Sequence, residues 1–326
     1  MKKLKIQRKL KNFNSNVKTK INNEIKRKGK KGFIWEIIFG FLIFCASAVL
    51  IFVLYIIISA PNFDKDKLYK KEATVIYDKN GVEFARVGQE DRELIEYKDL
   101  PQVYIDALIA TEDSRFFQHN GLDIARFLKA SVGQLVSSKA GGASTITMQL
   151  VKKTYTNGAS KGIAGIIRKF TDIYMAVFKI ESSYTKEEIL EFYSNSLWYA
   201  NGRSINTTGI YGVEQASQHF FGKSVRDLNL AEASLIVGMY QNPRLYNPYN
   251  NPVGCRNRQK VVLKLMVNHG YITEEEMNAV LEIPIESMVA DDSDAVSTND
   301  YQVLIDHVID EVYEKTKKDA RQVPMK

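Results

Sequence analysis

Three short segments of the sequence combine residue types that can do chemistry. The first is TEDSRFFQHNG, residues 111–121, in which Glu112 follows an apolar helical face that carries Ile105, Leu108 and Ile109. Desolvation at the edge of such a face makes a carboxylate a better proton acceptor. Glu112 is therefore a candidate general base, although acidic residues at helix ends are often simply solvated.

The second segment is GGASTITMQLVKK, residues 141–153, a glycine-rich loop that leads into a helix. Its glycines allow the backbone to approach a ligand, and Ser144 and Thr145 offer hydroxyl and amide donors at the helix start. Gln149 and Lys152 follow on that helix, which predicts an anion site that needs no metal. No Gly-Lys-Ser/Thr sequence closes the loop, so it is not a nucleotide phosphate loop.

The third segment is RKFTD, residues 168–172, where Arg168 and Lys169 lie one helical turn from Asp172. Two cations beside a carboxylate suit a leaving pyrophosphate, whose developing negative charge must be stabilised. An exposed row of ion pairs would give the same triplet, so this segment is informative only together with the other two.

The elements that must position these residues are mostly helices. Helical periodicity predicts helices over residues 101–112, 122–136, 186–196, 231–240, 256–268, 274–281 and 301–317. Two helix starts, at Thr185 and Thr273, have the spacing of a capping box. Strands over residues 74–77 and 82–87 flank Asn80-Gly81, which predicts a β-hairpin with a two-residue type I′ turn. The prediction is a mainly α chain.

An apolar stretch, residues 37–60, follows Glu36 without a charged side chain. As a helix it can cross the roughly 30 Å hydrocarbon core of a bilayer, and it is longer than the apolar region of a cleaved signal peptide. Basic residues at 26–31 precede it, whereas the charges after it balance, so the positive-inside rule places the N-terminus in the cytoplasm. A second segment, residues 157–167, carries three glycines among apolar residues, and it is a candidate lipid contact because it belongs to a membrane-anchored domain.

Composition and charge narrow the class of protein. With 45% hydrophobic residues over 326 positions, the chain can bury a sizeable core in one or two domains. Residues 1–31 carry 13 Lys and Arg against Glu24, a net charge of +12, so the remainder carries −5 of the total of +7. Beside a membrane span such an arm is expected to contact anionic lipid, not nucleic acid. Cys45 and Cys255 are not expected to form a disulfide.

Six segments, taken in their order and spacing, resemble the family 51 peptidoglycan glycosyltransferases. This family comprises the polymerase domains of class A penicillin-binding proteins and the monofunctional transglycosylases. The segments are TEDSRFFQHNG, GASTITMQLVKK, RKFTD, TKEEILEFYSN, GVEQASQHFFGK and the pattern Arg258-x-x-Val261-x-Leu263. The resemblance covers residues 75–266 and implies a mainly α, lysozyme-like fold that joins lipid II units into glycan chains.

The resemblance implies roles for particular residues. Glu112 matches the catalytic glutamate, which takes the proton from the acceptor 4-hydroxyl as that oxygen attacks the donor's anomeric carbon, with inversion and a β-1,4 link. Asp172 matches the second carboxylate. The residues implied in substrate binding are Asp113, Phe116, His119, Ser144, Thr145, Gln149, Lys152, Arg168 and Lys169. No metal ligand and no required cofactor are implied, and a divalent cation could assist.

The sequence departs from the family pattern at a few positions. Asp172 is one methylene shorter than the usual glutamate, Met148 stands where many members have glutamine, and Lys153 stands where many have asparagine. From Asp172 to Glu181 the chain is one residue longer than the usual pattern, which disfavours Glu181 as a substitute. The role of Asp172 is therefore less secure than that of Glu112.

The predicted organisation has five parts. They are a basic cytoplasmic arm (1–31), a transmembrane anchor (33–60), a linker with the β-hairpin (61–100), a peptidoglycan glycosyltransferase domain (101–285), and a linker with a C-terminal helix (286–326). The chain as given holds no Ser-x-x-Lys and Lys-Thr-Gly pair, so it is not expected to be a transpeptidase and could be part of a longer bifunctional protein. The expected location is the bacterial cell membrane, with the catalytic domain extracytoplasmic. Expected partners are lipid II, the growing lipid-linked glycan, the membrane and other cell-wall synthesis proteins.

Three other functions share some of these sequence features. A lytic enzyme of the lysozyme type would also use a glutamate, but it needs neither a cation cluster nor an anchor. A nucleotide-sugar transferase would use an Asp-x-Asp metal site, and Asp64-Lys65-Asp66 fits only formally, because it lies in a linker beside the membrane. A non-catalytic scaffold would keep the fold and recruit partners.

Overall fold

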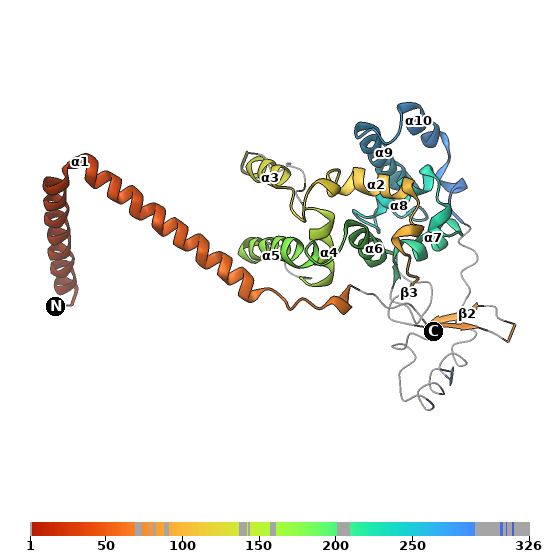
Figure 1. Cartoon of the computed structure of the whole chain (residues 1–326), viewed down its shortest axis with the longest axis horizontal. Helices are drawn as coiled ribbons and strands as arrows, with labels where there is room; N and C mark the ends of the chain where they lie inside the picture. Colours follow the sequence, from red (N-terminus) through yellow and green to blue (C-terminus); the bar gives the residue numbers. More distant parts are fainter. Residues whose placement is uncertain are drawn as a thin grey trace. The chain divides into compact units, whose positions relative to one another are not determined.

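The computed structural model describes most of the chain. The described residues are 2–68, 74–77, 79–80, 83–87, 91–136, 142, 144–156, 161–200, 209–290, 307–308, 311 and 315. The chain divides into two compact units, Met1–Ala60 and Pro61–Lys326 (Figure 1). Most of the predicted C-terminal helix lies outside the described residues. So do the first residues of the two predicted glycine-containing segments, 137–141 and 157–160.

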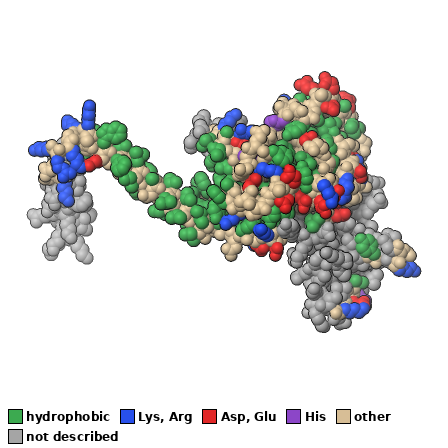
Figure 2. Space-filling model, viewed as in Figure 1, with side chains coloured by type: hydrophobic (Ala, Val, Ile, Leu, Met, Phe, Trp, Pro, Cys, Tyr) green, Lys and Arg blue, Asp and Glu red, His purple; other side chains and the backbone are tan. Residues whose placement is uncertain are grey.

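The first unit, α1 (Lys2–Ser59), consists of two helical segments that meet at a kink at Gly29, whose backbone is not helical. Gly29 has φ +75°, which glycine adopts without steric cost because it lacks a Cβ atom. The segment Lys26–Ser59 is long and apolar enough to cross a membrane. Figure 2 shows its green apolar surface beginning after a cluster of blue Lys and Arg side chains. The predicted N-terminal apolar helix is therefore confirmed, and its orientation stays a prediction.

The second unit is mostly helical. Its α-helices are α2 (Gln102–Glu112), α3 (Ile124–Val136), α4 (Ile146–Thr154), α5 (Gly162–Met175), α6 (Lys186–Ser196), α7 (Val213–Phe221), α8 (Leu230–Met239), α9 (Pro252–Asn268) and α10 (Glu274–Glu282). Its strands are β1 (Thr74–Tyr77), β2 (Glu83–Val87), β3 (Asp91–Arg92), β4 (Trp198–Ala200) and β5 (Ile210–Tyr211). The predicted mainly α fold with a small β-hairpin is confirmed.

The core of this unit is built around α8. Every residue from Ala231 to Met239 is buried, as expected for a helix that is apolar on all sides. The helices α2 and α9 pack against α8 and against each other (Figure 1). Fully burying a side chain such as Ile236 or Val262 stabilises the fold by about 1.5–3 kcal/mol. The core therefore fixes α2, whose last residue is Glu112.

Two capping boxes were predicted correctly from the sequence. The Thr185 hydroxyl accepts from the Glu188 backbone amide while the Glu188 carboxylate accepts from the Thr185 amide, and Thr273 and Glu276 repeat this exchange at α10. These reciprocal bonds satisfy backbone donors that helix starts otherwise leave unpaired. The starts of α6 and α10 are thus fixed locally.

The β structure contains the predicted hairpin and one sheet that was not predicted. In the hairpin, the last residue pair is Tyr77 with Glu83, and the register shifts between Ile76 and Tyr77. The predicted type I′ turn at Asn80-Gly81 includes Gly81, which lies outside the described residues, so the turn stays a prediction. A second sheet, in the order β3-β5-β4, was not predicted, since its strands are only two or three residues long. The side chain of Asn195 secures this region by bonding both backbone groups of Ile95.

A π-helical turn, Ala176–Ile180, continues α5. The Glu181 amide donates to the Ala176 carbonyl five residues earlier, at 3.0 Å. A π turn accommodates one extra residue in an otherwise α-helical run and often occurs at functional sites. It lies between Asp172 and Glu181, where the family resemblance implies one residue more than the usual pattern. The helices α5 and α7 were absent from the predicted set of helices.

Candidate active site

One cavity of about 690 Å³ gathers most of the predicted site residues. It is lined by Thr111, Glu112, Arg126, Gly142, Ser144, Met148, Gln149, Lys152, Lys153, Arg168, Lys169, Asp172, Tyr240, Gln241 and Arg258. Seven of the eleven predicted residues are in this set. They come from all three chemical segments, so the fold brings together motifs that are separated along the chain.

Glu112 is the last residue of α2 and faces the cavity at the end of the core helix. The Gln149 side-chain amide on α4 donates to Glu112 Oε2 at 2.8 Å. The carbonyl end of the same amide accepts from the Tyr193 hydroxyl on α6 at 3.0 Å. The Gln149 amide therefore fixes the Glu112 carboxylate, and Tyr193 in turn fixes the Gln149 amide.

The cavity is strongly basic. Six cationic side chains line it against the two carboxylates of Glu112 and Asp172. The cations are Arg126, Lys152, Lys153, Arg168, Lys169 and Arg258. Such an excess of positive charge in a concave site stabilises a bound or developing anion, and it acts more strongly where protein excludes water.

Asp172 lies on α5 at the edge of this cluster and is only 3% exposed. Its carboxylate accepts from the Thr156 hydroxyl, and Arg168 Nε lies 3.8 Å from its Oδ2. Burial raises the pKa of Asp172, and the hydrogen bond from Thr156 and the nearby cations only partly oppose this. Asp172 is therefore a carboxylate in a costly environment, which is common at functional sites.

The lysines of the cavity are also perturbed. Lys169 Nζ donates to Ser144 Oγ at 2.6 Å, which joins α5 to the residue before the cap of α4. Desolvation lowers the pKa of Lys169, and Arg168 and Lys152 lower it further while Asp172 opposes them. Desolvation likewise lowers the pKa of Lys153, helped by Lys152 and opposed by Glu112. The Lys153 side chain is exposed, yet enough protein lies around its amino group to desolvate that group in part.

The other four predicted residues lie behind the cavity wall. They are Asp113, Phe116, His119 and Thr145, and all except His119 are buried to 1% exposure or less. Asp113 accepts from the Ile146 amide at 3.1 Å at the start of α4, and it contacts His119 Nε2 at 3.1 Å. Thr145 caps α4 and donates to the Gly121 carbonyl at 2.7 Å. Their placement ties the first segment to the second, and substrate contact by them stays a prediction.

The structure adds residues that sequence reasoning did not place in the site. Arg126 on α3 donates to the Glu112 carbonyl at 3.2 Å and to the Gly142 carbonyl at 3.1 Å. Tyr240 and Gln241 reach the cavity from the end of α8, and Arg258 reaches it from α9. Arg258 belongs to the Arg258-x-x-Val261-x-Leu263 pattern, and this pattern is the one sequence feature that could have indicated its place in the site. The others are brought to the site by helix packing alone.

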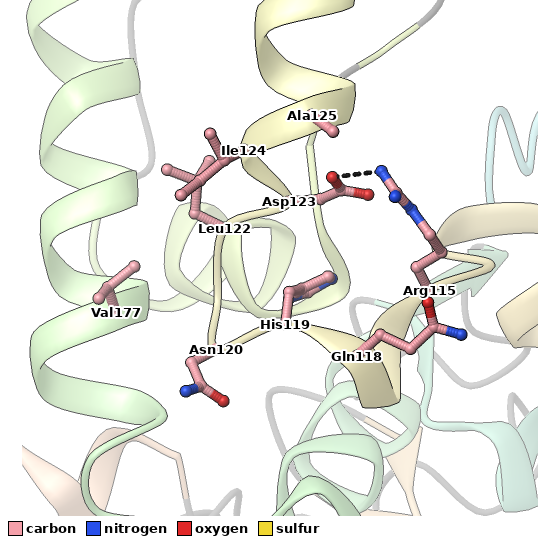
Figure 3. Close-up of a pocket in the computed structure, with 9 residues that line it drawn as sticks. All are labelled: Arg115, Gln118, His119, Asn120, Leu122, Asp123, Ile124, Ala125 and Val177. Carbon is pink, nitrogen blue, oxygen red and sulfur yellow. Dashed lines mark hydrogen bonds and ion pairs between the residues drawn. The ribbon is translucent and has the colours of Figure 1, made fainter.

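A second cavity, of about 510 Å³, is lined by the loop after α2, the start of α3 and Val177 (Figure 3). Arg115 and Asp123 form an ion pair at 2.5 Å on one side, and Leu122 and Ile124 point towards Val177 on the other. His119 is the one predicted site residue that lines it. Among the residues that the structure describes, no group of three or more His, Cys, Asp or Glu could hold a metal ion.

Comparisons with known proteins agree with these motifs. A family model described as transglycosylase matches residues 80–267. The chain is similar to penicillin-binding protein 1A/1B of Bacillus subtilis, with 32% identity over 90% of this chain and 32% of the relative. It is also similar to penicillin-binding protein 1A of Streptococcus pneumoniae, with 32% identity over 82% of this chain and 35% of the relative. For penicillin-binding protein 1A of Neisseria gonorrhoeae the values are 36%, 86% and 34%.

Among solved structures, penicillin-binding protein 1A from Haemophilus influenzae has a TM-score of 0.43 and 23% identity, over 77% of this chain and 25% of that chain. The chain spans about a third of the length of the curated relatives it matches. The family model covers more than half of the chain, including all three chemical segments. The chain belongs to the transglycosylase family.

Proposed function

We propose that the chain is a peptidoglycan glycosyltransferase that polymerises lipid II into β-1,4-linked glycan strands. The single observation that carries this proposal is the cavity itself. It holds one carboxylate at the end of a core helix, Glu112, and faces it with six cations. A proton acceptor opposite a cradle for a diphosphate is what glycosyl transfer from a lipid-linked donor requires.

In the proposed reaction Glu112 accepts the proton of the acceptor sugar's 4-hydroxyl. The hydroxyl oxygen attacks the anomeric carbon of the donor while the bond from that carbon to the diphosphate oxygen breaks, so the electron pair leaves with the lipid diphosphate. Attack from the opposite face inverts the anomeric centre. Lys152, Arg168 and Lys169 stabilise the negative charge that develops on the leaving group.

The remaining residues have supporting roles in this proposal. Asp172 holds Arg168 beside the diphosphate through their ion pair and attracts Lys169, and Thr156 orients the Asp172 carboxylate. Ser144 positions Lys169 through their hydrogen bond. Asp113, His119 and Thr145 keep the loop after Glu112 fixed on the start of α4. No cofactor has a step in this reaction, and a requirement for a divalent cation is left to experiment.

The substrate is a lipid, so the proposed site must work at a membrane surface. Several large apolar side chains of the second unit are exposed on α3, α5 and the π turn that follows. They are Ile124, Leu128, Ile163, Ile166, Phe170 and Phe178. We assign these apolar side chains to contact with the outer leaflet of the bacterial cell membrane. The N-terminal basic arm then lies in the cytoplasm.

The test is polymerisation of labelled lipid II by the purified full chain in detergent, with and without Glu112→Gln. Glutamine preserves the shape of Glu112 but cannot accept the proton, so we expect glycan polymer from the wild type and a loss of at least about 100-fold in the variant. The matched control is Glu187→Gln, a change to an exposed glutamate on α6, which should leave the rate unchanged.

Other outcomes would point to other functions. Release of muropeptides from finished cell walls would favour a lytic enzyme, for which six cations around the carboxylate have no evident use. Absence of both products would leave a scaffold that keeps the family fold. Equal activity of wild type and Glu112→Gln would exclude Glu112 as the base.

A further inference from the structure

A chain of hydrogen bonds links Glu112 to a buried tyrosine that the motif comparison assigned no role. Glu112 Oε2 accepts from Gln149 Nε2 at 2.8 Å, and Gln149 Oε1 accepts from the Tyr193 hydroxyl at 3.0 Å. The three residues come from α2, α4 and α6. We propose that Tyr193 is a positioning residue that holds Glu112 through the Gln149 amide. This inference rests on the proposed function of Glu112 as the base.

The chemistry of the amide makes this chain directional. A side-chain amide has a donor end and an acceptor end, and an ionised carboxylate can only accept. The Gln149 NH₂ group must therefore face Glu112, and its carbonyl must face a donor, which Tyr193 supplies. Both ends of the amide are satisfied in this orientation alone.

The surroundings of Tyr193 keep its hydroxyl in the donor role. The residue is 1% exposed, and its ring packs edge-on against Tyr240 with centroids 6.1 Å apart. Burial is the main cause that raises the pKa of Tyr193 well above its ordinary value of 10, and the negative charge of Glu112 raises it further. The hydroxyl therefore stays protonated. The capping box at Thr185 and Glu188 fixes the start of α6, the helix that carries Tyr193.

The arrangement matters most when Glu112 changes its charge. Once Glu112 has taken a proton it can donate, and an unrestrained Gln149 could turn its carbonyl towards the acid. Tyr193 opposes this turn, because its hydroxyl already donates to that carbonyl. The same Gln149 donor therefore faces Glu112 before and after proton transfer, and the carboxylate keeps one orientation through successive turnovers. An interaction of this kind acts on the rate more than on substrate binding.

The first test is Tyr193→Phe in the full chain, which removes only the hydroxyl. We expect kcat for lipid II polymerisation to fall about tenfold, while KM stays within about twofold. The matched control is Tyr249→Phe, which removes a hydroxyl that bonds the His219 and Ala290 carbonyls outside the cavity lining. This control should retain the wild-type kcat. A Tyr193→Phe protein with unchanged kcat would overturn the inference.

The second test asks whether Tyr193 acts through Gln149. In a Gln149→Ala background the relay is already cut, so adding Tyr193→Phe should cause no further loss in kcat. A further loss of about tenfold would mean that the two residues act independently, and it would overturn the inference. Thermal unfolding of each variant establishes that the compared proteins are folded.

The third test needs no turnover. In a crystal structure of Tyr193→Phe, we expect Gln149 to leave Glu112 or to take more than one side-chain conformation. A Gln149–Glu112 hydrogen bond that stays fully formed would overturn the inference. If the wild type makes no polymer, the proposed function fails, but this structural comparison still decides whether Tyr193 holds the carboxylate.

Discussion

Glu112 and Asp172 line the same cavity in different environments. Glu112 is half-buried and accepts a hydrogen bond from a neutral amide, whereas Asp172 is buried and lies beside Arg168. Two carboxylates in unlike surroundings commonly take unlike roles. This division fits a base at position 112 and an electrostatic partner for the cations at position 172.

The raised pKa of Asp172 predicts a specific dependence of stability on pH. At pH values below its ordinary pKa of 3.8, Asp172 is protonated in both the folded and the unfolded state, so it adds no pH dependence to the free energy of unfolding. Between that value and the raised folded value, the folded state binds more protons, so the free energy of unfolding falls as pH rises. We expect the unfolding free energy of wild type minus that of Asp172→Asn to fall across this window and then level off.

The control for this measurement has the opposite sign. A hydrogen bond from Arg226 lowers the pKa of Asp99, so its contribution to stability is lost as pH falls. The difference between wild type and Asp99→Asn should therefore rise with pH in the acidic range. Denaturant unfolding at a series of pH values measures both differences. A rising difference for Asp172→Asn would show that the cations outweigh its burial.

At the scale of elements, we infer that the π turn after α5 accommodates the extra residue that the family resemblance implies between Asp172 and Glu181. Asp172 faces the cavity, while Glu181 accepts from Thr147 at 2.5 Å and from Lys186 at 2.8 Å. An additional residue in a regular α-helix would rotate everything beyond it by about 100°. The π turn absorbs this rotation, so both carboxylates reach their partners.

We therefore expect the π turn to tolerate the deletion of one residue. Removing Phe178, which is exposed, should let the segment become regular α-helix and lower Tm by only about 3 °C or less. Deletion of the exposed Lys264 in the middle of α9 is the control. With no bulge to absorb it, that deletion should turn part of α9 away from the core and cost about 4 kcal/mol or prevent folding. Similar melting of the two deletion variants would contradict the role of the π turn.

At the scale of the whole molecule, the chain combines a helix able to span a membrane with a separate compact unit that holds the cavity. An anchor confines an enzyme and a lipid substrate to the same surface, which raises the effective concentration of one near the other. In this proposal the anchor keeps the enzyme near its lipid substrate, and the second unit carries out the reaction.

Deleting residues 1–60 should therefore slow polymerisation on membranes containing lipid II by about tenfold or more. Turnover in detergent should change much less, because there the micelle brings both components together. Replacing residues 1–60 with an unrelated single-span anchor is the control, and it should restore the rate on membranes. Equal losses in detergent and on membranes would show instead that the anchor supports the structure of the catalytic unit.

Much of this organisation follows from local properties of the sequence. Pattern alone predicts the features that depend on residues close in the chain. These features are the apolar span, the capping boxes at Thr185 and Thr273, and the periodicity of α2 and α6. The order and spacing of the motifs likewise predicted the family and singled out Glu112.

The tertiary structure decided which side chains meet. Gln149 bonds Glu112, 37 residues away, and Tyr193, 44 residues away. Arg126 and Arg258 reach the same cavity from helices with unrelated sequence patterns. Strands of two or three residues and a single π turn leave too little periodicity to detect. Such contacts depend on how helices pack around α8, and packing depends on the whole set of buried side chains rather than on any one segment.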